Sequence, residues 1–447
     1  MSVGRGHSFG TNVLISFVFT AGLMGLAFSN SVVVARMVGA EGRGLYALAV
    51  AILGILVPLV NFGLGLSSIW SLGRGESPGE VSSLNHLWSA LVLIVGAALA
   101  GAGVWWFHGL PEAEWALVAF SLAVTTPAAV YVENTRGFFL GRNQVVRYNG
   151  VQASTASVLL LANVTLLGWG PKAVLLTLGL AYWVPALGML LGHLPHVARA
   201  VWPRRAFVNG SLGYGARATG SHLIEVMLYR LDYLLVTPIV GMAAIGMFSV
   251  ADQIAGMLSL VGLVAGRMML AQSASDPTGE TSRRKLGLSV RTLLLVVGLG
   301  SLALAATGWW IVPAVFGEEF RASVLGLMIL LPNALSRGAN GLISAHLIGR
   351  NVIRPVLIAG SVAVVMMLVL SPLAALVFGW LGVAAVRGIV MSAQLALNVR
   401  AYTEESGEAM RWIFDAQDYR ALRAWLTARL RRGPAGPGDA PPPPPSP

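Results

Sequence analysis

Long apolar segments alternate with short polar ones along nearly the whole chain. A helix needs about 20 mostly apolar residues to cross a bilayer, and twelve segments fit that requirement. Most connections between them are short, so consecutive helices are expected to lie antiparallel. The predicted spans are 12–35, 45–70, 84–107, 115–140, 147–169, 173–192, 212–238, 243–269, 287–309, 322–348, 353–377 and 379–401.

The turn between the first two predicted spans recurs between the seventh and the eighth. Gly241 and Gly246 follow Gly39 and Gly44 by 202 residues each (241 − 39 and 246 − 44). Glycine permits a tight turn between antiparallel helices. A second match joins Gly141-Arg142-Asn143 to Gly349-Arg350-Asn351, where the arginine complements a helix C-terminus and anionic lipid. The matches predict two halves of six spans with the same topology.

The predicted fold class is therefore an all-α integral membrane protein, with about twelve transmembrane helices in two similar six-helix bundles around a central cavity. Rocking of the two bundles would give a substrate alternating access to that cavity. The predicted organisation is a cytoplasmic N-terminus (1–11), a first bundle (12–192), a cytoplasmic linker (193–211), a second bundle (212–403), an amphipathic interfacial helix (404–432) and a disordered Pro-rich tail (433–447).

Basic residues in the loops predict the orientation. One set of alternate connections holds twelve Arg and Lys residues, and the other set holds four: Arg36, Arg43, Lys172 and Arg321. Because positive charge favours the cytoplasmic side, both termini are expected in the cytoplasm, and the protein in a bacterial inner membrane.

Composition agrees with this placement and excludes several kinds of chemistry. Charged residues make up only 11% of the chain, too few to cover the surface of a soluble protein. The sequence has no cysteine, which excludes disulfides and thiolate metal sites. The net charge of +11 points to anionic lipid head groups rather than to nucleic acid.

Charged residues inside predicted spans are costly and are therefore functional candidates. Glu133 and Arg136 are three residues apart and share a helix face. Asp232 is expected to find a partner on another helix. Asp232 and Asp252 could also carry a coupling proton or sodium ion; no other cofactor or metal is expected. The ion-pair or coupling candidates are Glu133, Glu225, Asp232 and Asp252.

Arg337 and Arg387 have no acidic residue on their own spans. They are the best candidates to bind an anionic substrate, because a guanidinium can hold two phosphate oxygens at once. Arg36 and Arg267 lie near span ends, where snorkelling to the interface is the simpler interpretation. The substrate-binding candidates are Arg136, Arg230, Arg337, Arg387, Asn333 and Asn340.

Two segments carry a resemblance to a known superfamily: ARMVGAEGRGLYALAVAIL at 35–53 and YGARATGSHLIEVMLYRLDYLLVTPIVGMAAIGMFSVADQI at 214–254. Over about residues 8–403 the chain resembles the multidrug/oligosaccharidyl-lipid/polysaccharide (MOP) flippases, and within them the polysaccharide flippases of the O-antigen, or Wzx, type. The resemblance implies transport of an undecaprenyl-diphosphate-linked oligosaccharide for surface polysaccharide synthesis, with cavity arginines as ligands. Its expected partners are the lipid-linked glycan, anionic lipids and other polysaccharide-assembly proteins.

Three alternatives remain open at the level of sequence. A cation-coupled drug exporter of the same superfamily would need an acidic cavity, whereas arginines exceed unpaired acids here. A membrane glycan polymerase or ligase usually needs a long outer loop with reactive groups, and none is predicted. A major-facilitator transporter also has twelve spans, but SLGRGESPGE after the second span lacks the charged Gly-Asp-Arg pattern of that family.

Overall fold

The structure, a computed structural model, describes residues 9–107, 113–197, 201–276, 278–410 and 412. The predicted amphipathic helix and Pro-rich tail therefore lie almost entirely outside the described residues. The helices are α1 (Phe9–Asn61), α2 (Leu64–Gly73), α3 (Pro78–Phe107), α4 (Ala113–Gly141), α5 (Val145–Leu166), η1 (Leu167–Trp169), α6 (Ala173–Val197), α7 (Arg205–Val240), α8 (Met242–Ser275), α9 (Glu280–Phe316), η2 (Glu318–Ala322), α10 (Ser323–Gly349) and α11 (Ile353–Ser406).

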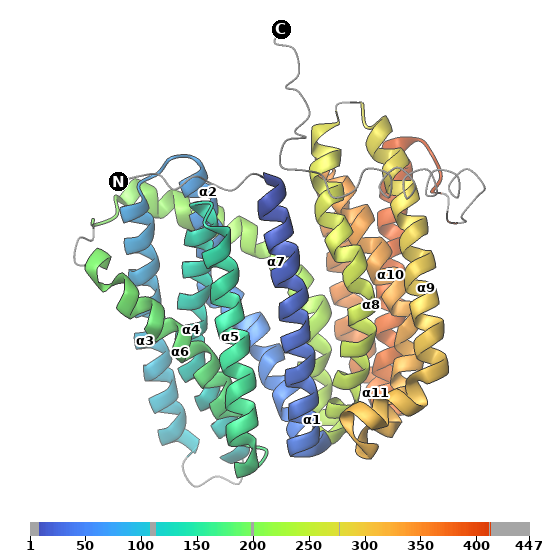
Figure 1. The fold of residues 1–447 in the computed structure, drawn as a ribbon, viewed down its shortest axis with the longest axis horizontal. Helices are drawn as coiled ribbons and strands as arrows, with labels where there is room; N and C mark the ends of the chain where they lie inside the picture. The colour runs from blue at the N-terminus through green and yellow to red at the C-terminus, as the bar shows by residue number, and fades with distance from the viewer. Residues whose placement is uncertain (1–8, 108–112, 198–200, 277, 411, 413–447) are drawn as a thin grey trace.

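Nine helices in the described part are long and apolar enough to cross a membrane. Two of them contain two spans each, because α1 turns back at Gly39 and α11 turns back at Gly379. The more polar helix α7 brings the number of spans to the predicted twelve. Connections alternate between two ends of the molecule. We call them the Gly39 end, at the bottom of Figure 1, and the Arg142 end, at the top.

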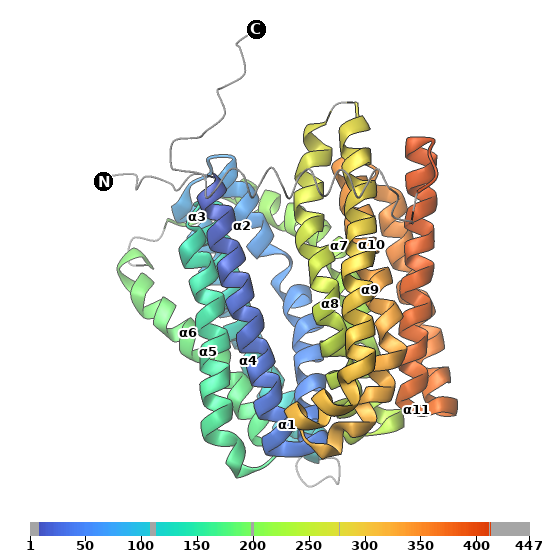
Figure 2. The same cartoon turned by 45° about the vertical axis from the view of Figure 1, so that its right-hand side comes forward.

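The helices form two bundles side by side, α1–α6 and α7–α11 (Figures 1 and 2). At the Gly39 end one apolar core runs through both bundles. It joins Ala40 and Ala47 of α1 to Val236 of α7, Phe248 of α8 and Phe320 of η2, all at most 7% exposed. Burial of this shared core stabilises the contact between the halves. The predicted all-α membrane fold in two halves is confirmed.

The repeated turns have the same backbone geometry in both halves. Gly39 (φ 63°, ψ −167°) and Gly241 (φ 85°, ψ 166°) occupy a region open essentially only to glycine. Asn143 and Asn351 are both left-handed, with φ 57° and 64°. Each asparagine follows its helix in a Schellman arrangement, with equivalent backbone hydrogen bonds. The sequence matches therefore mark equivalent structural positions.

Gly44 and Gly246 have a role that the sequence interpretation missed. A Cβ atom on Gly44 would lie 1.9 Å from the carbonyl oxygen of Met242, and one on Gly246 would lie 1.9 Å from that of Ala40. Met242 also follows Ala40 by 202 residues (242 − 40), so the repeat relates the two contacts to each other. These glycines let α1 and α8 touch backbone to backbone across the two halves. Their interpretation as turn residues was wrong.

The second predicted span, 45–70, is not continuous. Phe62 and Gly63 are left-handed (φ 53° and 66°) and separate α1 from α2. A Cβ atom on Gly63 would lie 2.4 Å from the carbonyl oxygen of Gly215, so the break lets α7 approach closely. In addition, α7 begins at Arg205, inside the predicted linker, and Phe207 packs with Leu64 in an apolar cluster. The start of α7 thus contacts the first bundle.

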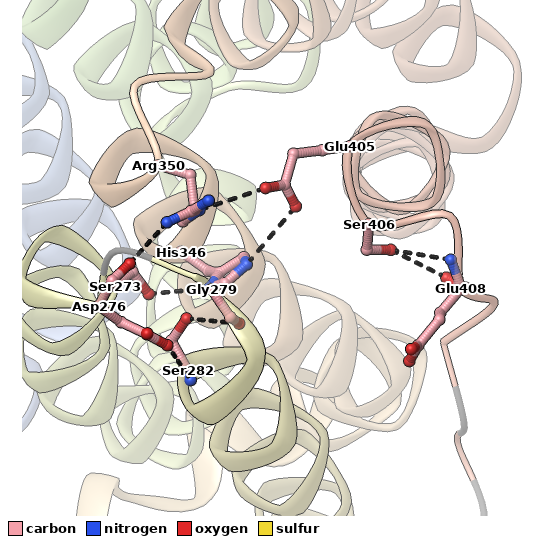
Figure 3. A network of polar contacts seen from close by, with 9 residues as sticks. All are labelled: Ser273, Asp276, Gly279, Ser282, His346, Arg350, Glu405, Ser406 and Glu408. Carbon is pink, nitrogen blue, oxygen red and sulfur yellow. Dashed lines mark hydrogen bonds and ion pairs between the residues drawn. The ribbon is translucent and has the colours of Figure 1, made fainter.

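Figure 3 shows how the second Gly-Arg-Asn turn holds the Arg142 end of the second bundle together. Arg350 donates to Glu405 Oε1 of α11 (Nε, 3.2 Å) and to the carbonyl oxygen of Asp276 after α8 (Nη1, 2.7 Å). Asp276 in turn accepts the backbone N–H of Ser282 in α9 at 2.7 Å, and this bond helps to hold the pKa of its carboxyl below the usual range. The arginine therefore joins helices as well as complementing a helix C-terminus.

A buried ion-pair cluster lies nearer the Gly39 end of the second bundle. Arg387 of α11 is 1% exposed and donates to both oxygens of Asp232 of α7, at 2.9 and 2.7 Å. It also pairs with Asp252 of α8, and its guanidinium stands 4.9 Å from the ring centre of Phe248. Three helices are thus joined through one side chain. The expectation that Asp232 finds its partner on another helix is confirmed.

The Gly44 contact leaves no room for a side chain. Overpacking of this kind costs about 1–3 kcal/mol, so Gly44→Ala and Gly246→Ala should each lower the melting temperature of the purified protein. The repeat predicts effects of similar size. Gly298→Ala in α9 is the control, because nothing lies within 4 Å of its added Cβ. Equal melting of all three variants would contradict the contact.

Removal of one partner from the buried cluster leaves an uncompensated charge. Arg387→Met should therefore destabilise the protein by about 3–5 kcal/mol, measured by thermal unfolding in detergent. Adding Asp232→Asn and Asp252→Asn should restore part of that loss. Arg400→Gln, which breaks an exposed pair with Glu404, should cost less than about 1 kcal/mol. A triple variant less stable than Arg387→Met would argue against this electrostatic explanation.

Candidate functional site

A cavity of about 650 Å³ lies within the second half of the molecule. Its walls are α7, α8, α10 and α11, and Leu66 of α2 adds a contribution from the first half. The lining positions belong to the parts of these helices nearer the Arg142 end, for example 218–229 of α7 and 337–348 of α10. A cavity of this size holds a drug-sized group.

Arg337 is the cavity residue best suited to an anion. Its guanidinium stands over the ring of Tyr229, 3.9 Å from the ring centre. Within the described residues, no carboxylate forms an ion pair with it. Stacking occupies one face of the guanidinium and leaves its N–H edge free for oxygen ligands. Arg337 thus has no ion-pair partner in the described part of the chain, and substrate binding by it stays a prediction.

Two asparagines of α10 were predicted beside Arg337, and they have different surroundings. Asn340 lines the cavity, and its Oδ1 accepts a 2.6 Å hydrogen bond from Nδ2 of the buried Asn398. Asn333 lies about two turns nearer the Gly39 end than Asn340. It is 4% exposed and is not among the lining residues of this cavity. Its Oδ1 is buried and has no hydrogen-bond partner in the described part. Asn340 alone is placed to contact a ligand in this cavity.

The other charged groups of the cavity are mixed in sign. Arg267 of α8 lines it, so its position is more than that of an interfacial anchor. Glu225 and His222 line it from α7, and both are exposed. Two guanidiniums against one carboxylate leave the wall net positive. From the sequence, Arg267 was interpreted only as a residue at the end of a span. Hydrophobic periodicity does not show which face of α8 packs against other helices and which face lines a cavity.

Arg136 and Glu133 lie apart from this cavity, in the first bundle. They form the expected ion pair at 2.8 Å. Arg136 also donates to the hydroxyl of Tyr148 and to Oε1 of Gln152, both at 3.1 Å. These contacts join α4 to α5. The pair predicted from i,i+3 spacing is confirmed, and Arg136 already has neutralising and hydrogen-bonding partners.

Arg387 is not among the residues that line this cavity. The sequence showed no acid on its own span, but Asp232 and Asp252 reach it from two other helices, and it is 1% exposed. Arg387 is therefore paired inside the second bundle, and substrate binding by it stays a prediction. A coupling proton or sodium ion stays a prediction; of the two acids, only Asp252 is accessible, at 17% of its side chain against 0% for Asp232.

Arg230 lies between the halves rather than in the cavity. Its Nε would be 3.6 Å from a Cβ atom on Gly54 of α1. The same interface holds Arg43, which the sequence counted among loop residues. The helix restarts directly after Gly39, so Arg43 lies in its first turn, is 5% exposed, and donates to Ser249 and Gln253 of α8. A buried arginine so close to a turn carries no signal in the hydropathy pattern.

Solved structures share this architecture at low sequence identity. The lipid II flippase MurJ in an inward closed conformation matches with a TM-score of 0.68 and 12% identity, over 95% of this chain and 94% of that one. An inward-facing multidrug resistance MATE family transporter of the MOP superfamily matches with a TM-score of 0.68 and 14% identity, over 86% and 94%. A MOP superfamily transporter from Pyrococcus furiosus, whose binding pocket has reversed polarity, matches with a TM-score of 0.53 and 16% identity, over 88% of this chain and 93% of that one.

A search of curated protein sequences finds no match. The family model described as polysaccharide biosynthesis protein matches residues 9–268, which is more than half of the chain. That range includes the first bundle, α7 and most of α8, with the glycine contact between α1 and α8. The chain is therefore a multi-pass membrane protein with the MOP superfamily fold, and it belongs to the polysaccharide biosynthesis protein family.

Proposed function

We propose that this protein moves a lipid-diphosphate-linked oligosaccharide from the inner to the outer leaflet of a bacterial cytoplasmic membrane, for surface polysaccharide synthesis. The observation that carries the proposal is Arg337, a guanidinium that lines the cavity and forms no ion pair within the described residues. The polysaccharide biosynthesis family and the fold shared with a lipid II flippase support it. The excess of Arg over Glu in the cavity disfavours a cationic drug.

In this proposal the Arg142 end faces the cytoplasm, as the loop charges indicate, and both termini lie on that side. The diphosphate binds at Arg337, the glycan occupies the cavity, and the lipid tail stays in the bilayer. The close contact of Gly44 with α8 lies at the Gly39 end, so the rocking motion has to separate α1 from α8 there. Opening of the Gly39 end would release the head group at the outer face.

Polar contacts hold the Gly39 end closed in this structure. Arg36 of α1 donates through Nε to the carbonyl oxygen of Val315 near the end of α9, at 2.7 Å. Glu319 accepts the backbone N–H of Ala40, just after the α1 turn, at 3.0 Å. Both contacts cross between the halves, so both must break when the outer side opens. We call them the outer latch.

Loss of the Arg337 charge should impair transport. In a strain without this gene, lipid-linked glycan should accumulate at the inner leaflet. Arg337→Gln should restore about a tenth of wild-type transport or less, because a charge-assisted hydrogen bond is worth roughly 1.5–3 kcal/mol. Arg337→Lys should be intermediate, since it keeps the charge and loses the fork.

Arg321→Gln is the matched control, because Arg321 is 56% exposed and pairs with Glu318. It should transport at the wild-type rate. Membrane levels of each variant are measured in parallel. If the deletion strain shows no accumulation of glycan and becomes sensitive to cationic drugs, the protein is an exporter and the proposal fails.

Weakening the outer latch should favour opening at the Gly39 end. The chain has no cysteine, so Ser31→Cys, at a position 1% exposed, provides a single reporter. Glu319→Gln should raise the rate of its labelling by a membrane-impermeant maleimide about fivefold, consistent with a loss of roughly 1 kcal/mol. Glu318→Gln, which leaves the latch intact, should not change the rate. An unchanged rate in both variants would show that the latch does not control opening.

A further inference from the structure

Gln394 of α11 is a buried amide on the wall of the 650 Å³ cavity. It is 7% exposed, and its Oε1 is buried without a hydrogen-bond partner in the described part of the chain. A buried acceptor that lacks a donor is costly and is seldom kept without a reason. The side chain therefore calls for a donor that a ligand brings into the cavity.

Two further neutral groups line the same wall from α10, and a buried residue behind them sets their roles. Nδ2 of Asn398, which is 0% exposed, donates to Oδ1 of Asn340 at 2.6 Å and to Oγ of Ser344 at 3.1 Å. These bonds use the amide oxygen of Asn340 and one lone pair of the hydroxyl. Because Asn340 and Ser344 both line the cavity, the amide N–H groups and the O–H remain as donors toward a ligand there.

The wall thus combines an acceptor that needs a donor with donors that need acceptors. Ionised phosphate oxygens only accept hydrogen bonds, so a diphosphate cannot satisfy Oε1 of Gln394. An ammonium group could donate, but Arg337 and Arg267 make the cavity net positive and disfavour it. A hydroxyl donates and accepts at once, and a secondary amide also carries both functions. Carbohydrates present several such groups on one ring.

Gln394 lies beside the cavity arginine. The hydroxyls of Ser336 in α10 and Ser392 in α11 are 3.1 Å apart. Arg337 follows the first of these residues by one position, and Gln394 follows the second by two, so both lie within one turn of the same contact. Both side chains line the cavity. A phosphate at the arginine and a sugar joined to that phosphate can therefore occupy neighbouring parts of one cavity.

We propose that Gln394, Asn340 and Ser344 form a carbohydrate subsite, which binds the first sugar of the lipid-linked glycan through its hydroxyl or amide groups. This rests on the proposed function and deepens it. Arg337 takes the charge that every lipid diphosphate carries, and the neutral wall distinguishes a lipid that bears a sugar from one that does not. Gln394 is the specificity-determining residue, since its amide oxygen is the group that a phosphate leaves unsatisfied.

The test uses the full-length protein in lipid nanodiscs and three probes: undecaprenyl diphosphate, and the same lipid carrying glucose or N-acetylglucosamine. Melting temperature against probe concentration gives each affinity. In the wild type at least one sugar should raise the affinity about fivefold or more over the bare lipid diphosphate. Gln394→Leu should abolish this gain and leave the affinity for the bare lipid diphosphate unchanged. Gln272→Leu, at an exposed position of α8 outside the cavity, is the matched control and should keep the gain.

A structural role for Gln394 is tested in the same experiment. Gln394→Leu replaces an unpaired polar group by an apolar one of similar size, so without probe it should melt at or above the wild type. Should it melt lower, Ser344→Ala, which removes a single hydroxyl, decides the question: a smaller sugar gain supports the subsite, and an undiminished gain overturns it.

Three results overturn the proposal directly. In the first, neither sugar raises the affinity of the wild type. In the second, Gln394→Leu keeps the sugar gain. In the third, Gln394→Leu weakens binding of the bare and the sugar-bearing lipids by the same factor, because the residue then acts on the phosphates or on the fold.

These outcomes are separate from those of the proposed function, because binding is measured on purified protein without transport. Equal affinity of the wild type for all three lipids, combined with accumulation of glycan in the deletion strain, would overturn the subsite and keep the transport proposal. A sugar gain that is lost in Gln394→Leu, combined with no accumulation of glycan, would do the reverse.

Discussion

The approach of two backbones at Gly44 and Gly246 is the constraint on which the rest of the structure depends. Each glycine faces a carbonyl oxygen of the other half at a distance that no Cβ atom could occupy. Because the contact is reciprocal, it fixes α1 against α8 at the Gly39 end. The shared apolar core forms around it. The cavity lies away from this contact, toward the Arg142 end.

Charge neutralisation separates structural arginines from candidate ligands in this fold. Arg387 has two carboxylates and is fully buried, so it holds α7, α8 and α11 together. Arg136 has Glu133 and two hydrogen-bond acceptors on α5. Arg337 forms no ion pair within the described residues, and its guanidinium stands over an aromatic ring. An aromatic face stabilises a cation without cancelling its charge, so Arg337 keeps its attraction for an anion.

The sequence predicted the membrane fold because hydropathy and repeat spacing are local properties. It also predicted the Glu133–Arg136 pair, since both lie on one helix. It could not assign the partners of Arg387, because Asp232 and Asp252 lie 155 and 135 residues away in the chain (387 − 232 and 387 − 252). The burial of Arg43 was missed for the same reason, because it depends on α8, which is distant in the chain. The break at Phe62 was missed because hydropathy is insensitive to backbone conformation.

The duplication extends to the scaffold and not to the arginines. At the repeat offset of 202, Ile245 corresponds to Arg43 and Phe28 to Arg230; at the later offset of 208, Ala129 corresponds to Arg337. Arg337 and Tyr229 belong to one bundle, so they move together when the bundles rock. Arg43 and Arg230 belong to different bundles, so the same motion changes the distance between them. A ligand that contacts Arg337 alone would favour neither arrangement of the halves, so it must also touch the first bundle, for example at Leu66, to shift their equilibrium.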